Sequence, residues 1–289
     1  MILPLLLAGI AASIPASPPV LIASHRSCWQ AASENALDGI RICSAAGIDI
    51  VEIDVRTTSD GELVLMHDAT VDRTTDGSGA VNTLSAVAIA ALRQRREGGG
   101  PDAALTDRRV PTLAQALRAA RGGATVNLDV KDADLHKVID IVVAAGMGPS
   151  VLLNVPVDVD AAVVRHARAA KVPLQPVYLE RGSGMSIEQA LAPWRGRTIG
   201  ALQLIFDDPA ILDRARAVLP NVRLFVNTMA VDIESGRPMR LSATYLDTTA
   251  ITQPERIWGG LIRRGVSIIQ TDQPWQLRAW LNGRSVASR

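Results

Sequence analysis

The stretch Ile48–Asp68, which reads IDIVEIDVRTTSDGELVLMHD, determines how the rest of the chain is interpreted. Its first part alternates as a β-strand does, with Glu52 and Asp54 on one face and aliphatic residues on the other. The two carboxylates lie about 7 Å apart along such a strand, a spacing that suits two oxygen ligands of one hard cation. A turn signal at residues 59–61 precedes a second extended run that ends in His67. The alternative is a solvent-exposed strand edge with a surface histidine.

The composition is that of an ordinary globular protein. Of the 289 residues, 48% are hydrophobic and 20% charged, and the net charge is +1. This balance gives no sign of a nucleic-acid surface or of a patch for anionic membranes. Aromatic residues make up only 3%, which argues against base-stacking platforms. We therefore expect no nucleic-acid partner and no stable membrane insertion; the sequence does not predict the oligomeric state.

The N-terminus predicts export of the chain. Residues 1–16 form an apolar run followed by small residues, which resembles a secretory signal with cleavage after Ala16, although no Lys or Arg precedes Arg26. The remaining residues, 17–289, are expected to form a single domain in the periplasm or outside the cell. The alternative is a buried first strand with a ragged leader.

Two cysteines, Cys28 and Cys43, occur in the chain, and an exported protein could join them in a disulfide. A helix is expected from Glu34, after Ser33 as its N-cap, to Ala46. Cys43 would then lie about 13 Å along the helix axis. Because that separation requires the preceding loop to fold down against the helix, we expect two free, buried thiols.

The order of elements predicts an α/β fold. The link after Arg56 is too short for a helical crossover, so the run ending at His67 must return antiparallel as a hairpin. Apart from this return, eight strands alternate mostly with helices, a pattern typical of a (β/α)8 TIM barrel. A doubly wound open sheet is the alternative, but no glycine fingerprint opens the first crossover. The strands are expected at 20–25, 50–56, 124–131, 151–155, 173–178, 201–206, 223–227 and 266–271.

Polar side chains recur at the ends of these strands, where a barrel has its catalytic mouth. They are His25, Asp54, Lys131, Asn154, Asn227 and Asp272. The most unusual residues fall on three strands that a barrel places side by side. The first strand carries His25 and Arg26, the second with its hairpin carries Glu52, Asp54 and His67, and the third carries Asp129 and Lys131. Three carboxylates can hold Ca²⁺ or Mg²⁺, cationic side chains can bind phosphate oxygens, and two histidines can act as acid and base. This inventory favours metal-assisted phosphoryl transfer.

Several motifs of the chain resemble those of glycerophosphodiester phosphodiesterases. They are HR at 25–26, SEN at 33–35, GIDIVEIDVRTTSDGELVLMHD at 47–68, DRTTDGSG at 72–79, PTLAQAL at 111–117, LDVK at 128–131 and GVSIIQTDQP at 265–274. The resemblance implies a (β/α)8 barrel whose substrates are small-molecule phosphodiesters. It would hydrolyse glycerophosphodiesters to an alcohol and glycerol 3-phosphate with a divalent cation. It also implies a small insertion after the second-strand hairpin, at about 71–110.

The resemblance further implies roles for individual residues. His25 and His67 would be the acid/base pair, Glu52, Asp54 and Asp129 the metal ligands, and Arg26 and Lys131 substrate contacts. Trp29 could form a substrate wall or a packed lid, while Asp68 is expected to orient His67 or a backbone group. His136 and His166 are expected to be surface or packing residues.

The chain departs from the family pattern at Ser27, where glycine is usual, and at Asp129, where glutamate is usual. The residue pattern around Asn227 also lacks the family's tryptophan. These departures affect the alcohol specificity more than the chemistry. A sphingomyelinase D or lysophospholipase D-like phosphodiesterase is the enzymatic alternative. A non-catalytic barrel that binds phosphodiesters is the alternative outside enzymes.

Overall fold

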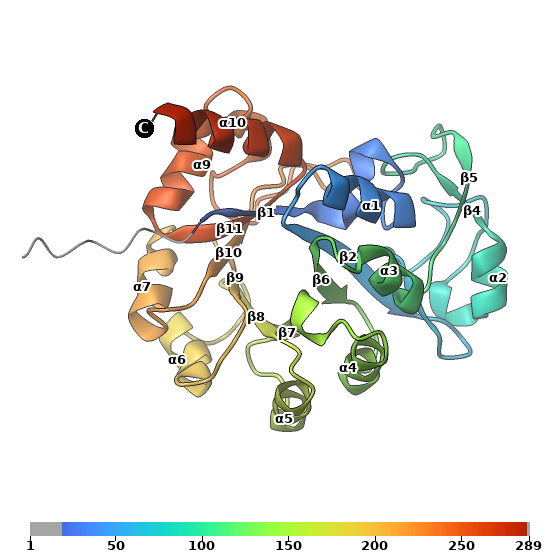
Figure 1. The fold of residues 1–289 in the computed structure, drawn as a ribbon, viewed down its shortest axis with the longest axis horizontal. Helices are drawn as coiled ribbons and strands as arrows, with labels where there is room; N and C mark the ends of the chain where they lie inside the picture. The colour runs from blue at the N-terminus through green and yellow to red at the C-terminus, as the bar shows by residue number, and fades with distance from the viewer. Residues whose placement is uncertain (1–18, 288–289) are drawn as a thin grey trace, which may run out of the picture.

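A computed structural model describes residues 19–287, so the predicted signal at 1–16 lies outside the described residues. Nine strands form one sheet in the order β1-β11-β10-β9-β8-β7-β6-β2-β3, and an additional pairing of β1 with β2 closes it. All neighbours pair in parallel except β3. The predicted (β/α)8 barrel is therefore confirmed (Figure 1). Its parallel strands are β1 Leu21–Ser24, β2 Ile50–Thr57, β6 Thr125–Val130, β7 Val151–Pro156, β8 Leu174–Leu179, β9 Leu202–Ile205, β10 Leu224–Asn227 and β11 Val266–Thr271.

Helices surround the barrel in Figure 1, each burying one face against the strands. They are α1 Leu37–Ala45, α3 Leu113–Ala120, α4 Leu135–Ala144, α5 Ala161–Ala169, α6 Ile187–Leu191, α7 Ala210–Val218, α9 Pro254–Arg263 and α10 Pro274–Ala287, with a short α8 at Asp247–Ala250. N-cap residues determine where several of these helices begin. Thr112 and Ser186, for example, each form a capping box at the N-terminus of a helix. Within residues 19–287, no helix is long and apolar enough to cross a membrane.

The hairpin return is β3, Leu63–Leu65, which pairs antiparallel with β2 as expected. The segment that follows, at about 71–110, is the predicted insertion and is called the insertion from here on. It contains η3 Val81–Thr83, α2 Ala86–Ala91 and a two-stranded sheet of β4 Arg93–Arg95 with β5 Leu105–Arg109. It projects to one side of the barrel in Figure 1 and has a small apolar core of its own. Within this segment the helix α2 ends at Ala91, and the chain continues into β4.

The interior of the barrel is apolar only at its lower end. Seven side chains close that end, namely Leu21, Ala23, Ile50, Leu152, Ala201, Phe225 and Ile268. Above them, successive strands point hydrogen-bonding side chains inward: Glu52, Asn127, Asn154, Gln175, Gln203, Asn227 and Gln270. Burying so many polar groups is costly unless they bond one another or a ligand. The core thus gives way to a polar mouth at the carboxyl ends of the strands.

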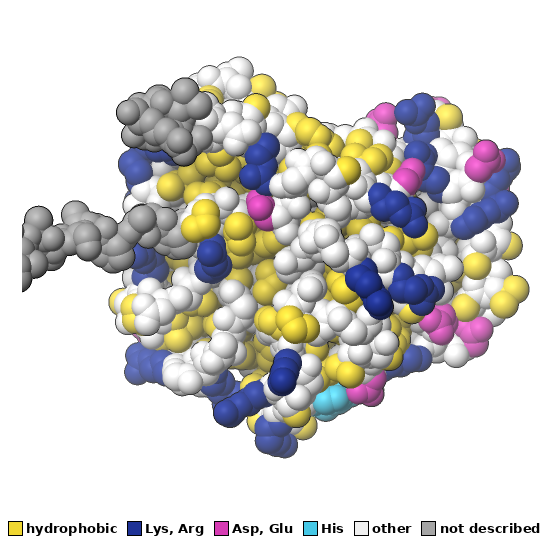
Figure 2. Space-filling view, in the orientation of Figure 1, with side chains coloured by type: hydrophobic (Ala, Val, Ile, Leu, Met, Phe, Trp, Pro, Cys, Tyr) yellow, Lys and Arg dark blue, Asp and Glu magenta, His cyan; other side chains and the backbone are white. Residues whose placement is uncertain are grey.

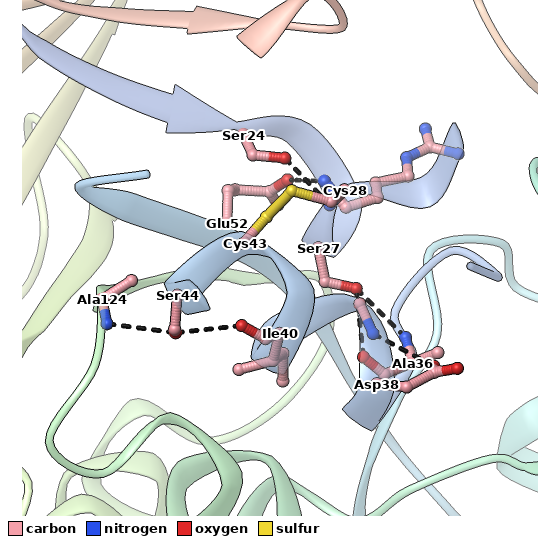
Figure 3. The surroundings of a disulfide bond; sticks show 12 residues. Ser24, Ser27, Cys28, Ala36, Asp38, Ile40, Cys43, Ser44, Glu52 and Ala124 are labelled. Carbon is pink, nitrogen blue, oxygen red and sulfur yellow. Dashed lines mark hydrogen bonds between the residues drawn. A yellow bond between two sulfur atoms is a disulfide. The ribbon is translucent and has the colours of Figure 1, made fainter. Parts of the chain in front are cut away.

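The prediction of two free thiols was wrong, because Cys28 and Cys43 form a disulfide (Figure 3). The helix α1 begins at Leu37, not Glu34, so Cys43 lies nearer its start than expected. The chain before it makes two 3-10 turns, η1 His25–Ser27 and η2 Trp29–Ala31, instead of running straight into a helix. These turns fold against α1 and bring the two Cα atoms to 6.0 Å.

The molecular face in the view of Figure 1 carries mixed charge. Figure 2 shows Lys and Arg side chains spread around apolar side chains, with acidic side chains mainly towards the insertion. No single sign of charge covers this face.

Candidate functional site

Three predicted ligands meet at the mouth of the barrel. Strands β2 and β6 pair so that Asp54 lies opposite Asp129, and Glu52 is two residues earlier on β2. The side chains of Glu52, Asp54 and Asp129 offer oxygen atoms that all lie within 4.8 Å of one another. Glu52 and Asp54 are buried and Asp129 is partly exposed. The alternation of β2 therefore places both of its carboxylates inside the barrel rather than at a solvent-exposed edge.

Hydrogen bonds fix the two buried carboxylates. Glu52 Oε2 accepts from the backbone N–H of Arg26 at 2.8 Å and from Nε2 of Gln270 at 3.2 Å. Asp54 Oδ2 accepts from Nδ2 of Asn35 at 2.8 Å, while Asn35 Oδ1 accepts from the Asp54 N–H at 2.9 Å. Each carboxylate is thus held by donors from other elements, which orients its remaining oxygen.

The charges around these carboxylates are unevenly balanced. Burial and the nearby charges of Asp54 and Asp129 raise the pKa of Glu52 well above its ordinary value. Burial opposes ionisation of Asp54 too, but Lys131 and Arg26 hold its pKa below the ordinary range. The Lys131 Nζ lies 2.9 Å from Asp54 Oδ1 and 2.6 Å from Asp129 Oδ2. A divalent cation would relieve the repulsion that raises the pKa of Glu52, so these oxygens fit Ca²⁺ or Mg²⁺.

His25 is supported by a carboxylate at the end of β11. Its Nδ1 lies 2.9 Å from Oδ1 of Asp272, which also accepts from Nε1 of Trp29 at 2.7 Å. Burial opposes ionisation of Asp272, but His25 and Trp29 lower its pKa, so the carboxylate accepts and Nδ1 carries the hydrogen. The Nε2 atom of His25 is then available for proton transfer. Trp29, predicted as a wall or a lid, is anchored next to this histidine.

His67 has the same kind of support from the adjacent residue. Its Nδ1 lies 2.9 Å from Oδ1 of Asp68, whose two oxygens also accept from Arg73 at 2.7 Å each. Arg73 in turn donates to both oxygens of Glu34 and to the carbonyl of Gly98. Burial opposes ionisation of Asp68, yet its bonds to His67 and Arg73 lower its pKa. This geometry agrees with the prediction that Asp68 orients His67.

A second group of possible ligand atoms consists of His67, Asp68 and Glu234. Because both oxygens of Asp68 already accept from Arg73, this group is less suited to a cation than the three carboxylates of β2 and β6.

The turn after β1 is bent by left-handed backbone. Arg26, Ser27 and Cys28 have φ angles of 44°, 57° and 53°. Ser27 is the position at which the resembling family has glycine, and a positive φ is the conformation that glycine adopts without strain. The turn also packs closely on α1, because a Cβ on Gly39 would lie 2.1 Å from the Ser27 carbonyl oxygen. The Arg26 backbone N–H that donates to Glu52 lies in this bend.

Several residues that support the site carried no role in the sequence prediction. Glu34, Asn35 and Arg73 lie in quoted motifs, so the signal for them was present but unassigned. Asp247 has no such signal, although it accepts from Thr228, Thr271 and the backbone N–H of Asp272.

The other two histidines, His136 and His166, lie on α4 and α5 with their rings stacked 5.1 Å apart. They contact each other, as expected for packing residues, and neither is bonded to a predicted site residue.

The described part of the molecule has hollows both beside the mouth and away from it. One of about 460 Å³ lies beside the mouth, between Trp29, the insertion at 96–104 and Ile233. A larger hollow of about 680 Å³ lies between α5 and the segment 194–200, and no predicted site residue lines it.

Comparison with known proteins gives a family match over the part of the chain that holds most of the site. A model described as the glycerophosphoryl diester phosphodiesterase family matches residues 25–176, and one described as a domain of unknown function matches residues 187–281. Glycerophosphodiester phosphodiesterase 1 of Mus musculus is 41% identical over 115 residues, which are 37% of this chain and 33% of that protein. A glycerophosphodiester phosphodiesterase of Caldanaerobacter subterraneus is 33% identical over 112 residues, or 38% of this chain and 45% of that one.

The matches to the mouse, rat and human relatives thus span about a third of those proteins' length. Solved structures extend the likeness in fold to almost the whole chain. A glycerophosphoryl diester phosphodiesterase from Parabacteroides distasonis superposes with a TM-score of 0.69 at 21% identity, covering 93% of this chain and 88% of that one. An Oleispira antarctica phosphodiesterase in complex with the product sn-glycerol-3-phosphate superposes with a TM-score of 0.60 at 17% identity. The superposition covers 92% of this chain and 97% of that one.

Proposed function

The chain belongs to the glycerophosphoryl diester phosphodiesterase family, and on that premise we propose that it hydrolyses glycerophosphodiesters to an alcohol and glycerol 3-phosphate with a divalent cation. One observation carries this proposal. Three carboxylates and two histidines, each histidine supported by its own carboxylate, share a single barrel mouth. The names of the curated relatives, and the product bound to the Oleispira antarctica enzyme, support the same activity.

The residues of β2 and β6 would bind the cation and the phosphate. Glu52, Asp54 and Asp129 would hold Ca²⁺ or Mg²⁺, which when bound supplies positive charge to the non-bridging phosphate oxygens. Lys131 and Arg26 would add fixed positive charge beside the phosphate. Burial by itself would lower the pKa of Lys131, but the surrounding carboxylates outweigh it and raise the pKa above its ordinary value. The ammonium group therefore stays charged at neutral pH.

The histidines would move the protons. One deprotonates the attacking hydroxyl or water, and the other protonates the leaving alkoxide. In each, Nδ1 is engaged by a carboxylate, so Nε2 is the atom that can face the reaction. Asp272 and Asp68 also stabilise the imidazolium form that arises during the reaction.

We also propose that the chain is exported and forms one domain over residues 17–289. The disulfide supports export, because such bonds persist in oxidising compartments.

The deciding experiment measures release of glycerol 3-phosphate from glycerophosphocholine, first with a chelator and then with Ca²⁺ or Mg²⁺ restored. We expect turnover to vanish with the chelator and to return with one of the ions. Turnover that is insensitive to the chelator would contradict the metal dependence. Bound metal without turnover would point to another phosphodiester as the substrate.

A second experiment separates the enzyme from a barrel that only binds phosphodiesters. We expect His67→Ala to lower kcat by about 10²- to 10⁴-fold, because it removes one of two proton carriers. The matched control is His136→Ala, a histidine outside the mouth, which should leave kcat unchanged. A wild-type protein that binds glycerophosphocholine but shows no turnover to lose would instead be the binding barrel.

A further inference from the structure

The larger hollow, of about 680 Å³, lies at the end of the barrel opposite to the mouth. One of its walls is the helix α5, and the other is the segment 194–200. Its floor includes the residues that lead into β8 and β9, and both strands run from there towards the mouth. None of the candidate ligands or histidines lines this hollow, so the proposed reaction gives it no role.

A short helix leaves this space open. The helix α5 packs against α4, and α6, the next helix around the barrel in Figure 1, packs against α7. The helix α6 has only five residues and is followed by the 3-10 turn η5 Ala192–Trp194, after which the chain crosses to β9 without a further helix. The C-terminal half of α5 therefore faces an extended segment across the hollow instead of a neighbouring helix.

That segment is held against the barrel at Gly200. A Cβ on Gly200 would lie 2.3 Å from Cδ2 of Leu152, one of the side chains that close the lower end of the barrel. Only glycine allows so close an approach, and the hollow consequently has a wall fixed by packing.

The interior of the hollow is apolar. Val172, Leu174 and Ile199 line it, and the first two are buried in the core of the barrel. Trp194 also lines it, is 2% exposed, and donates from Nε1 to the carbonyl of Val157 at 2.8 Å. Because this bond satisfies the only polar atom of the indole, the ring offers the hollow an apolar surface. Hydrocarbon is the chemical group that such an interior favours.

The rim of the hollow has four exposed cations and no carboxylate. Arg165 and Arg168 lie on α5, Lys171 follows that helix, and Arg197 lies on the facing segment. Within residues 19–287, the side chains of Arg165, Arg168 and Lys171 have no hydrogen-bond or ion-pair partner. The rim therefore carries positive charge that the protein itself does not neutralise.

Helix stability alone does not explain this cluster. A basic side chain in the last turn of a helix complements the helix dipole, which is sufficient reason for Arg168. It is no reason for Arg197, which comes from the opposite wall and whose guanidinium carbon lies 5.8 Å from the centroid of the Trp194 ring. Elsewhere on this side of the sequence an exposed arginine is paired, as Arg181 is with Asp207. Cations from both walls thus surround one apolar space.

We propose that this hollow binds a single-chain anionic amphiphile, such as a fatty acid anion, with its hydrocarbon chain between α5 and the segment 194–200 and its head group among the four cations of the rim. The volume suits such a molecule, because ligand cavities commonly measure about 300–1,000 Å³. Burial of the chain provides most of the affinity, and the cations select against neutral and cationic amphiphiles. The inference goes beyond the proposed function and uses no residue of the mouth.

The test compares three probes with the same eight-carbon chain, octanoate, 1-octanol and octylammonium, by calorimetry at low salt. A chelator is present throughout, so that no cation at the mouth can bind the carboxylate. We expect octanoate to bind most tightly and octylammonium least. Decanoate should bind more tightly than octanoate, by up to about four-fold for each additional buried methylene group, and butyrate should not bind.

Arg168→Glu should weaken the binding of octanoate by about five- to twenty-fold and leave that of 1-octanol unchanged, because it replaces an exposed ionic attraction with a repulsion. Arg118→Glu is the matched control, since Arg118 is also an exposed residue in the last turn of a helix, α3, but does not line the hollow. It should change neither affinity.

Ile199→Ser places a hydroxyl group in the apolar interior and should weaken the binding of octanoate and of 1-octanol alike. If this variant does not fold, Val164→Ser, at a half-buried position of α5 that also lines the hollow, replaces it.

Absence of octanoate binding to the wild-type protein would overturn the proposal. Octylammonium that binds as tightly as octanoate, or equal losses in Arg168→Glu and Arg118→Glu, would overturn it too. His67→Ala should bind octanoate as the wild-type protein does, whether or not the protein turns over glycerophosphodiesters. A loss of octanoate binding in His67→Ala would move the binding to the mouth and contradict the site beside α5.

Discussion

Buried carboxylates around the barrel mouth differ in their pKa because their neighbours differ. Burial raises the pKa of Glu52, which faces other carboxylates, whereas cations overcome burial at Asp54. Asp247 is 3% exposed and has only hydroxyl and amide donors around it, from Thr228, Thr271 and the backbone of Asp272. Burial therefore raises its pKa from 3.8 to about 6, which these donors only partly offset. No local sequence pattern indicates this environment.

The raised pKa of Asp247 predicts a pH dependence of stability. Since the folded pKa of about 6 exceeds the unfolded value of 3.8, the folded state keeps a proton that the unfolded state loses between these values. The contribution of this group to the free energy of unfolding is fully present below pH 3.8 and is lost as the pH rises through 6. The total loss is about 3 kcal/mol. We expect Asp247→Asn to remove that component, so that the change in unfolding free energy between pH 4 and pH 7 differs from wild type by up to that amount.

Chemical denaturation at pH 4, 5, 6 and 7 checks this expectation. Asp107→Asn, at an exposed position of β5, is the control and should keep the wild-type profile. An Asp247→Asn profile parallel to that of wild type would contradict the assignment.

At the scale of elements, the segment between β1 and α1 shows how the site depends on backbone geometry. The left-handed turn at Arg26–Cys28 directs a backbone N–H to Glu52, and the disulfide ties the same turn to α1. Figure 3 shows Cys28, Ser24 and Glu52 side by side above Cys43 of α1. Left-handed conformation is costly for residues other than glycine, so the turn needs such ties to persist. The disulfide therefore helps to hold a candidate metal ligand in place.

Removing the disulfide should destabilise the protein. The bond closes a loop with a sequence separation of 15, for which chain entropy predicts about 3 kcal/mol. We expect the Cys28→Ala, Cys43→Ala double variant to unfold several degrees below wild type in thermal denaturation. Reductant should lower the wild-type midpoint towards that of the variant and leave the variant unaffected.

A thiol assay under denaturing conditions provides the check on the bond itself. The oxidised wild-type protein should show no reactive thiol before reduction and two after it. Two reactive thiols before reduction would contradict the disulfide.

At the scale of the whole molecule, the insertion and the barrel meet at one charged cluster. Arg73, from the start of the insertion, forms ion pairs with Asp68 and with Glu34. Asp68 lies next to His67, and Glu34 also pairs with Arg26. Burial opposes the charge on Arg73, but its bonds to Asp68 and Glu34 raise its pKa above the ordinary value, so the link stays ionised. The insertion is therefore fixed to the mouth through Asp68, which supports His67, and through Glu34, which contacts Arg26.

The sequence by itself determined the barrel and the candidate residues Glu52, Asp54, Asp129, His25 and His67 at its mouth. Strand alternation, helix caps and the motif around Glu52 are patterns of residues close together in the chain. Such patterns can be recognised without knowing how distant segments contact one another. Only the tertiary structure decided the Cys28–Cys43 bond, the role of Asp247 and the hollow beside α5. Each of these depends on contacts between segments far apart in the chain, and no local pattern fixes a distance between such segments. Closure of the barrel set those distances, because it fixed the register of every strand against its neighbours.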